Sequence, residues 1–383
     1  MSGDATTRRR GGAESCSWPR VRLGEVCEVV YGERIRKIDA TATTYPVYGG
    51  GGETFRWATF NRENACVVSR FAMSKECVRF VKGRFFLNDS GLTVASINES
   101  LNQDFLDWFL MGSQSRIYAC GQGVAQRNVE IKRFRDLLIP LPPLAEQRRI
   151  VSKLDRLCDI VAKRKEQLLQ LQQLVKSRFV EMFGGFGNPK HLPICRVGDV
   201  IDAIDPHPSH RTPPAVKEGV PYVGVAECDR ETGTIKFERA RIVAQEVLDD
   251  HKNRYTIEEG DFLIGKIGTI GKPFFLPSEQ SYVLSANTVL IKPRRSLVEP
   301  QFLKIQFENQ FIEHQIASNA KSTSQPAFGM NKVRDLLMLN PPLALQREFA
   351  AFVDKVDKLA FAVRESLESV EKLYRQQLSE AFS

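Results

Sequence analysis

Arginine, lysine and amide side chains gather in polar loops in two parts of the chain, and their chemistry suits contacts with nucleic acid. Arg and Lys can hydrogen bond to guanine or to phosphate, whereas Asn and Gln can pair with adenine. A single residue of this kind is most often a solvated surface group, so the set as a whole supports the interpretation. We predict nucleic-acid contacts from Arg34, Arg36, Lys37, Arg56, Arg70, Lys75, Gln122, Gln126, Arg127, Asn128, His210, Arg211, Lys217, Lys266, Lys272, Lys321, Ser322 and Gln325.

Catalytic chemistry has weaker support in the sequence. Asn340-Pro341-Pro342-Leu343 resembles a motif of amino-methyltransferases, but Leu343 stands where that chemistry needs an aromatic ring to stack on the flipped base. The glycines of 183–187 follow a helical stretch, whereas a cofactor loop follows a strand. We therefore interpret the proline pair as the stiff start of a helix and expect no catalytic residue in this chain.

Nucleotide and metal sites are also disfavoured. The segment 265–272 is not a phosphate-binding loop, because Lys266 takes the place of its first glycine and Pro273 replaces the Ser or Thr that would hold magnesium. His207 and His210 lie in a proline-rich loop without acidic or Cys partners. We expect them to be exposed or to face DNA, and we predict no metal site.

Composition is that of a soluble protein of two or three domains, with 42% hydrophobic and 26% charged residues in 383. The net charge of +8 permits a nucleic-acid partner but does not require one. No apolar run approaches the roughly 18 residues of a membrane helix, and the first dozen residues lack the apolar core of a secretory signal. The 8 cysteines show no CxxC pair, so we expect reduced thiols in a cytoplasmic protein.

One long helical stretch, 145–183, must position these loops. It contains no Gly or Pro, and its apolar seam repeats every three or four residues, as in a coiled coil. The seam residues are Ile150, Leu154, Leu157, Val161, Arg164, Leu168, Leu171, Val175, Arg178 and Met182. A second copy lies 199 residues further on, and its seam residues are Phe349, Val353, Val356, Ala360, Val363, Leu367, Val370, Tyr374, Gln377 and Ala381.

The segments around the helices repeat as well. Pro142-Pro143-Leu144-Ala145 matches Pro341-Pro342-Leu343-Ala344, and Val21-Arg22-Leu23-Gly24-Glu25-Val26 matches Cys195-Arg196-Val197-Gly198-Asp199-Val200. Between these matching ends the two halves diverge. We predict mixed α/β domains with irregular sheets, including a strand over 281–291, a short buried helix over 105–111 and an amphipathic helix over 302–316.

The short connection 184–189 fixes the predicted topology. The second domain begins where the first helix ends, so the second helix must run back along the first as an antiparallel hairpin. The sequence therefore predicts two unlike α/β domains, separated by two long helices and related by a pseudo-two-fold axis. Each helix spans about 58 Å at 1.5 Å per residue.

This arrangement resembles the specificity subunit of type I restriction–modification systems. The resemblance rests on Tyr45-Pro46-Val47-Tyr48-Gly49, Pro142-Pro143-Leu144-Ala145-Glu146-Gln147 and Pro341-Pro342-Leu343-Ala344-Leu345-Gln346, and it covers nearly the whole chain from Trp18. The second copy has Leu345 where the first has the more usual Glu146. The residues before Trp18, which include Arg8-Arg9-Arg10 and Gly11-Gly12, are predicted from their composition to be a disordered basic tail (1–17). The resemblance implies target-recognition domains at 18–141 and 185–339, and conserved coiled-coil helices at 142–184 and 340–383.

The resemblance also implies a function and partners. The chain would be a non-catalytic reader of double-stranded DNA, with each domain binding one half of an asymmetric bipartite target. Its helices would dock two methyltransferase subunits, which would hold S-adenosylmethionine, and restriction subunits would join the complex. This chain would bind no cofactor itself.

Two other functions remain open from the sequence. A structural adaptor could bridge proteins through its helical hairpin without reading DNA, although such an adaptor would gain from keeping its two domains alike. A self-contained methyltransferase is disfavoured by the missing aromatic ring and the missing cofactor loop. Binding of the cofactor by the isolated chain would distinguish the methyltransferase.

Overall fold

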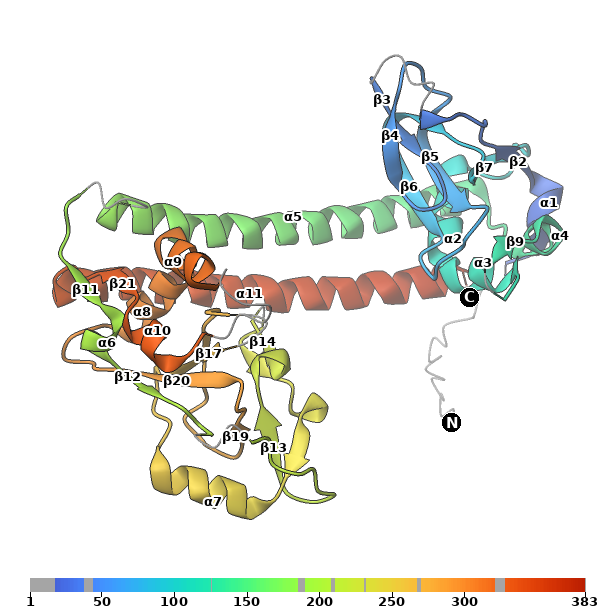
Figure 1. Cartoon of the computed structure of the whole chain (residues 1–383). Helices are drawn as coiled ribbons and strands as arrows, with labels where there is room; N and C mark the ends of the chain where they lie inside the picture. Colours follow the sequence, from blue (N-terminus) through green and yellow to red (C-terminus); the bar gives the residue numbers. More distant parts are fainter. Residues whose placement is uncertain are drawn as a thin grey trace, which may run out of the picture. The chain divides into compact units, whose positions relative to one another are not determined.

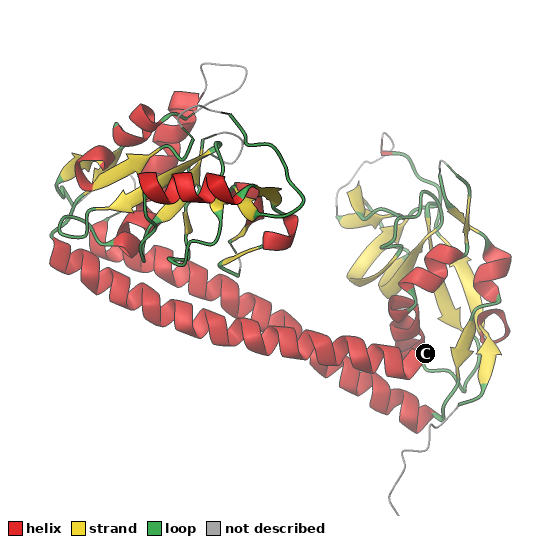
Figure 2. Ribbon diagram, turned by 90° about the horizontal axis from the view of Figure 1, so that it is seen from below, coloured by secondary structure: helices red, strands yellow, loops and turns green. Residues whose placement is uncertain are grey.

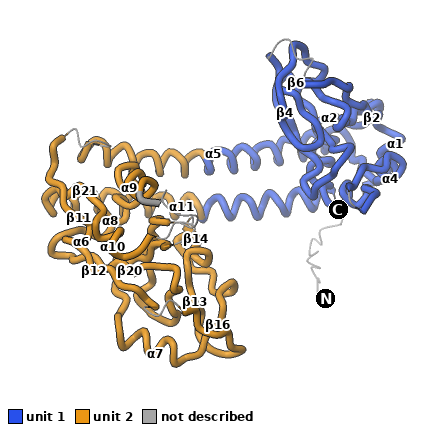
Figure 3. The backbone as a smooth tube through the Cα atoms, viewed as in Figure 1, with its two compact units in different colours: residues 1–165, 365–383 blue, residues 166–364 orange. Residues whose placement is uncertain are grey.

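The computed structural model describes residues 18–37, 44–124, 126–184, 190–207, 211–230, 232–266, 270–320 and 328–382. The chain forms two compact units, which are unit 1 (1–165 and 365–383) and unit 2 (166–364) (Figure 3). Each unit combines a domain with half of both long helices, whereas the predicted boundaries separate domains from helices. The predicted tail at 1–17 lies outside the described residues.

Each domain begins and ends with the same kinds of element, which together we call its frame, and the four frame elements of unit 2 lie close together in Figure 1. In unit 1 these elements are β1 (Arg20–Arg22), α1 (Leu23–Val26), α4 (Ile131–Arg135) and β10 (Leu138–Pro140). In unit 2 they are β11 (Ile194–Arg196), α6 (Val197–Val200), α10 (Met330–Arg334) and β21 (Leu337–Leu339). The first and last strands of each frame pair antiparallel, with Arg22 opposite Leu138 and Arg196 opposite Leu337. The matching ends of the two halves therefore form one repeated structure.

The repeated glycine follows from close packing within this frame. A Cβ atom added to Gly24 would lie 3.0 Å from the Cβ of Arg135, and one added to Gly198 would lie 2.9 Å from the Cβ of Arg334. Backbone hydrogen bonds fix both approaches, from Leu23 N to Leu137 O (2.8 Å) and from Val197 N to Leu336 O (2.7 Å). Both copies need glycine because any larger residue would push the two short helices apart.

In unit 1 the frame encloses one six-stranded sheet in the order β2-β7-β5-β6-β3-β4, in which only the β3–β6 pair is parallel. Its elements are β2 (Cys27–Tyr31), β3 (Tyr45–Tyr48), β4 (Glu53–Trp57), β5 (Arg62–Ser69), β6 (Val78–Leu87), β7 (Gly91–Ser96), α2 (Gln103–Gly112), α3 (Gln114–Ala119), β8 (Gly121–Gln122) and β9 (Asn128–Val129). The predicted helix at 105–111 is confirmed as part of α2. It buries Phe105 and Phe109 against Phe382.

Unit 2 encloses a different arrangement of three smaller sheets (Figure 2). The strand orders are β12-β20-β17-β18, β16-β13-β19 and β14-β15. The elements are β12 (Ile201–Ile204), β13 (Val220–Val223), η2 (Val225–Glu227), β14 (Cys228–Asp229), β15 (Thr234–Ile235), η3 (Phe237–Arg239), β16 (Arg241–Val243), α7 (Gln245–Arg254), β17 (Phe262–Gly265), β18 (Phe274–Phe275), β19 (Val283–Leu284), β20 (Thr288–Pro293), α8 (Pro300–Phe307) and α9 (Gln310–Ala320). The prediction of mixed α/β domains with irregular sheets is confirmed.

Two predicted elements of unit 2 are interrupted. The single strand expected over 281–291 is two strands in different sheets, because the chain turns at Ser285, whose carbonyl accepts from the Thr288 hydroxyl at 2.7 Å. The single helix expected over 302–316 breaks after Phe307. There, Asn309 Oδ1 accepts from Phe311 N at 3.0 Å and starts a new helix. In both places a side-chain hydrogen bond competes with the regular backbone pattern.

The long helices α5 (Leu144–Phe183) and α11 (Leu343–Phe382) contain 40 residues each and run antiparallel within each unit. In unit 1, Lys165 Nζ lies 2.9 Å from a Glu371 carboxylate oxygen, and Ile150 shares an apolar cluster with Ala381. In unit 2, Arg178 lies 3.0 Å from Glu348. All of the predicted seam residues are buried or half-buried. The predicted antiparallel coiled coil is therefore confirmed in both units.

A buried glutamine joins the start of each long helix to its domain. In unit 1, Gln147 is 0% exposed, and its Oε1 accepts from Asn102 N (2.8 Å), the cap of α2. Its Nε2 donates to Ser100 O (2.7 Å) and to Pro142 O (2.8 Å). In unit 2, Gln346 Oε1 accepts from Glu299 N (3.0 Å), the cap of α8, and its Nε2 donates to Pro341 O (2.8 Å).

We expect Gln147→Leu to lower the free energy of unfolding of unit 1 by about 3 kcal/mol, because it leaves buried backbone groups of Asn102, Ser100 and Pro142 without partners. Hydrogen exchange at the α2 amides and thermal unfolding would measure the loss. The control is Gln170→Leu on the same helix, where an exposed side chain donates to Glu166 and a change within about 0.5 kcal/mol is expected. Equal effects of the two variants would contradict this role of Gln147.

Candidate nucleic-acid interface

In unit 1 the structure brings six of the predicted contact residues to one loop and one hairpin. Arg70 and Lys75 lie in the loop between β5 and β6, while Gln122, Gln126, Arg127 and Asn128 lie in and between β8 and β9. Backbone hydrogen bonds join the two segments, from Met73 N to Arg127 O (2.8 Å) and from Val129 N to Arg70 O (2.9 Å). We call this surface, residues 70–76 with 121–129 except 125, the loop–hairpin surface.

Arg70 and Arg127 are each held against aromatic rings on this surface. The Arg70 guanidinium carbon lies 4.7 Å from the centre of the Tyr31 ring and 4.6 Å from that of Phe71. The Arg127 guanidinium carbon lies 4.7 Å from the Tyr118 ring centre, and its Nη2 donates to Gly121 O at 2.7 Å. Cation–π contacts of this kind hold a guanidinium in place without neutralising it. Sequence reasoning missed the three rings, because no spacing in the chain links them to the arginines.

The glycine-rich turn after β3 packs against the loop–hairpin surface. Gly50 N is bound by Ser90 Oγ (3.1 Å), and Gly50 O accepts from Ser69 Oγ (2.6 Å). A Cβ atom added to Gly50 would lie 3.1 Å from Ser90 O and 3.2 Å from Phe71 O. The turn therefore needs glycine for a close approach to the backbone that carries Arg70 and Phe71.

The other predicted residues of unit 1 are not part of the loop–hairpin surface as defined above. Arg34, Arg36 and Lys37 are exposed and follow the end of β2, three to six residues beyond Tyr31. Arg56 lies on the edge strand β4, where its Nη1 donates to Thr44 O (2.8 Å) and its Nε lies 3.7 Å from Glu53. The contacts of Arg56 thus remain within its own hairpin.

In unit 2 the structure describes four of the predicted residues, and no hydrogen bond or ion pair within the described part of the chain joins Arg211, Lys217, Lys266 and Lys272 to one another. Arg211 and Lys217 are exposed in the segment before β13. Lys272 pairs with the Glu313 carboxylate of α9, and its backbone carbonyl accepts from Arg230 Nη2 at 3.2 Å. His210, Lys321, Ser322 and Gln325 lie outside the described residues.

Lys266 is buried, whereas Lys37, Lys75 and Lys217 are exposed. Its side chain is 10% exposed, and Nζ lies 2.7 Å from the Asp205 carboxylate and 3.1 Å from Ala286 O. Its backbone also joins three segments, because Lys266 N donates to Asn287 O and Lys266 O accepts from Phe328 N. The Lys266 ammonium is therefore bound within the fold.

The prediction that His207 is exposed or faces DNA is wrong. His207 is 6% exposed, and its Nε2 lies 3.0 Å from Leu284 O. Its ring contacts His251, whose Nδ1 lies 2.6 Å from the Tyr255 hydroxyl. Burial, with the charges of His207 and Arg254, lowers the pKa of His251 to about 3, and burial also lowers the pKa of His207. Both rings are therefore neutral near pH 7 and belong to the core.

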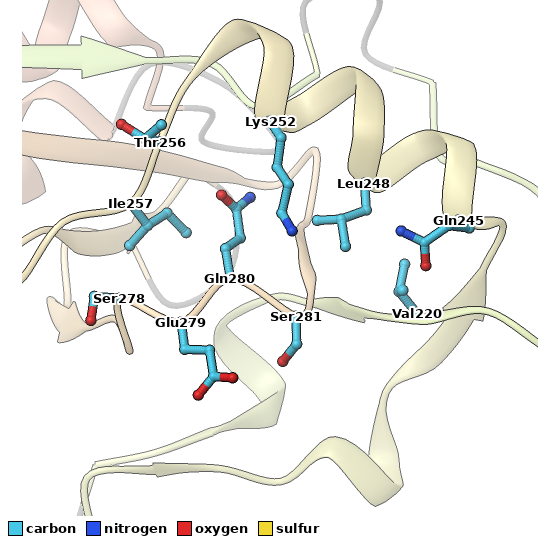
Figure 4. Close-up of a pocket in the computed structure, with 10 residues that line it drawn as sticks. All are labelled: Val220, Gln245, Leu248, Lys252, Thr256, Ile257, Ser278, Glu279, Gln280 and Ser281. Carbon is cyan, nitrogen blue, oxygen red and sulfur yellow. The ribbon is translucent and has the colours of Figure 1, made fainter.

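A hollow of about 610 Å³ lies beside α7 in unit 2 (Figure 4). Leu248 and Lys252 extend from the helix toward Gln280 and Ser281, and Glu279 lies on the same segment. None of the predicted contact residues in the described part of the chain lines it. The hollow therefore does not belong to the predicted interface.

Metal, thiol and membrane features can be stated for the described residues. No group of three or more His, Cys, Asp and Glu side chains there could hold a metal ion. The described cysteines are free, and burial raises the pKa of Cys77 and of Cys195 to about 11. Within the same residues, no helix has the length and apolarity needed to cross a membrane.

The repeated frame, the two unlike domains and the antiparallel helices define a protein built from two copies of one architecture. A model of the type I restriction modification DNA specificity domain matches residues 17–172 and again 217–372. The two matches cover more than half of the chain, so this protein belongs to that family.

Known members of the family are similar along most of their length. The type I restriction enzyme EcoBI specificity subunit of Escherichia coli is 22% identical over 326 residues, which cover 77% of this chain and 68% of that protein. The putative type I restriction enzyme specificity subunit S.HindORF215P of Haemophilus influenzae is 24% identical over 355 residues, which cover 90% of this chain and 89% of that protein.

Solved structures share the fold. The crystal structure of a type I restriction-modification system S subunit from M. genitalium has a TM-score of 0.64 at 18% identity and matches 96% of both chains. A chain from a study of complex assembly and conformational transition of the type I R-M system has a TM-score of 0.54 at 20% identity, and it matches 96% of this chain and 98% of that one. The predicted family and fold are therefore confirmed.

We expect Lys266→Met to lower the free energy of unfolding of unit 2 by about 3 kcal/mol, because it leaves the buried Asp205 carboxylate without its ion pair. Thermal unfolding and hydrogen exchange at the β17 amides would measure the change, and the further substitution Asp205→Leu should restore part of it. The control is Lys272→Met, which removes a solvent-exposed pair with Glu313 and should change stability by less than about 1 kcal/mol. Wild-type stability of Lys266→Met would show that the pair is dispensable.

Proposed function

We propose that this chain is the DNA sequence-specificity subunit of a type I restriction–modification complex, in which each unit reads one half of an asymmetric bipartite target. The observation that carries the proposal is the presence of one frame with two different domains in it. Two unlike domains suit two unlike half-sites, and a family model for DNA specificity matches the chain twice. An adaptor that only bridges proteins has no need of this difference.

In this proposal the chain contributes recognition and its partners contribute chemistry. Methyltransferase subunits bring S-adenosylmethionine and the methyl-transfer site, and restriction subunits bring cleavage. The tetrapeptide that resembles a methyltransferase motif supports this division, because it has a role in the frame. Asn340 N donates to Pro193 O (2.7 Å), and Pro341 O accepts from Gln346 Nε2 (2.8 Å) just before α11 begins.

Exposed apolar side chains on the helices support docking of the partner subunits. In unit 2, Leu169 and Leu174 of α5 are 66% and 46% exposed, and Leu359 and Phe361 of α11 are 59% and 62% exposed. These residues lie outside the seam that joins the two helices. Such exposed apolar groups on polar helices are typical of surfaces that bind protein.

The test of the proposal is methylation mapping with the complex reconstituted from this chain and its methyltransferase subunits. We expect methylated adenines at one bipartite asymmetric target and no methylation by this chain alone. A chimera that carries residues 18–141 in both domain positions should methylate a symmetric target, because the two frames have the same strand pairing at both ends.

Three outcomes would contradict the proposal. Methyl transfer by the purified chain alone would make it an enzyme. Assembly with methyltransferase subunits without any sequence preference would favour the adaptor. A folded chimera that keeps the asymmetric target would show that the exchanged domain does not read DNA.

The spacing between the half-sites gives a further prediction. Both long helices continue without a break from one unit into the other, which supports a role in setting this spacing. Four residues inserted after Gln170 in α5 and four after Leu359 in α11 add about 6 Å to each helix. We expect the same half-sites with a spacer longer by one or two base pairs of about 3.4 Å each. Methylation mapping would measure the spacer.

The insertion in α5 alone is the matched control. It moves the seam of α5 out of register with that of α11. We therefore expect lower thermal stability and a spacer of unchanged length. An unchanged spacer at full activity in the double insertion would show that the helices do not set the distance.

A further inference from the structure

Arg70 differs from other arginines of unit 1 in how its side chain is held. Its guanidinium lies over both the Tyr31 ring and the Phe71 ring, which are themselves 43% and 38% exposed. Only Nη1 has a hydrogen bond within the described residues, a long one of 3.4 Å to Asp89 O. The Nε and Nη2 groups are therefore available on a guanidinium whose plane the two rings restrain.

The charge of Arg70 has no carboxylate partner in the part of the chain that the structure describes. Arg84 in the same unit also lies over a ring, that of Phe60 at 4.7 Å, but it forms an ion pair with Glu63 at 3.2 Å. The positive charge of Arg70 is therefore held against two aromatic rings without an opposite charge beside it among the described residues, whereas the charge of Arg84 is balanced by Glu63.

The backbone around Arg70 is fixed from three sides. Arg70 N donates to Ser90 O (2.9 Å), and Arg70 O accepts from Val129 N (2.9 Å). Two residues further on, Ala72 has a left-handed φ of 48°, and its N–H is bound by Asn128 Oδ1 at 3.2 Å. An alanine in this conformation costs free energy, so these contacts hold a strained turn that presents Phe71 beside Arg70.

We propose that Arg70 reads a guanine in the half-site of unit 1, and the assignment rests on the function proposed above. A guanidinium can donate two parallel hydrogen bonds to O6 and N7 of guanine in the major groove, and no other base offers this pair of acceptors. The aromatic walls lower the entropy lost on binding, because the side chain is already ordered. Tyr31 and Phe71 are positioning residues for this contact.

The competing role for Arg70 is a contact with phosphate. A phosphate contact needs charge but no fixed plane, and a lysine can replace the arginine at such a contact. The two roles therefore predict different results for Arg70→Lys, which keeps the charge and removes the paired donors.

The experiment compares the reconstituted complexes of wild type, Arg70→Lys, Arg70→Ala, Phe71→Ala and Arg84→Ala on DNA in which each base pair of the mapped target is replaced in turn. For wild type we expect one guanine position in the unit 1 half-site where replacement abolishes methylation. Arg70→Lys and Arg70→Ala should reduce the preference at that position by about ten-fold or more and leave the other half-site unchanged. Phe71→Ala should weaken the same preference without changing the base.

The control Arg84→Ala should keep the wild-type preference at every position. The assignment is overturned if Arg70→Lys keeps the guanine preference. It is also overturned if Arg70→Ala weakens binding equally on all sequences and lowers the slope of log affinity against log salt concentration by about 1, as the loss of one phosphate contact would. Thermal unfolding shows which variants fold. If Arg70→Ala does not fold, Arg70→Lys still tests the assignment. A wild-type complex with no sequence preference would instead overturn the proposed function, and the assignment with it.

Discussion

The buried amide of Gln147, repeated in Gln346, is the interaction on which the rest of the structure depends. A glutamine at 0% exposure must satisfy both its donor and its acceptor inside the protein, and each of these residues does so with backbone groups before the helix and at the cap of the neighbouring domain helix. The direction of each long helix is thereby tied to its domain. Because the partners are backbone atoms, the domain can change nearly all its side chains and keep this connection.

This constraint explains why the sequence shows constant ends beside divergent interiors. The frame uses residues whose chemistry is fixed by close contact, such as Gly24 against Arg135 and Gly198 against Arg334. The interiors need only an apolar core and a closed chain, which a six-stranded sheet satisfies in unit 1 and three smaller sheets satisfy in unit 2. Unlike surfaces can therefore be carried on a common support.

The helices and the frame could be predicted from the sequence because their signals are local or repeated. A seam at every third or fourth residue defines α5 and α11, and the repeat identifies the frame without any knowledge of the contacts. The breaks at Ser285 and Asn309 could not be predicted, because each depends on a single side-chain hydrogen bond that outweighs a run of apolar residues. Lys266 and His207 are polar residues of a kind usually found at the protein surface. Only the fold brings Lys266 to the Asp205 carboxylate and His207 to Leu284 O.

The closure of each frame by a strand pair also has a consequence in polymer terms. The chain between Arg22 and Leu138 in unit 1 is a loop whose ends are held together, as is the chain between Arg196 and Leu337 in unit 2, which is longer by about 25 residues. The entropy of closing a loop grows only with the logarithm of its length, so this difference costs about 0.2 kcal/mol. Lengthening the enclosed segment therefore adds very little to the free energy of closing the loop. A domain of this kind can gain or lose whole hairpins while its ends stay joined.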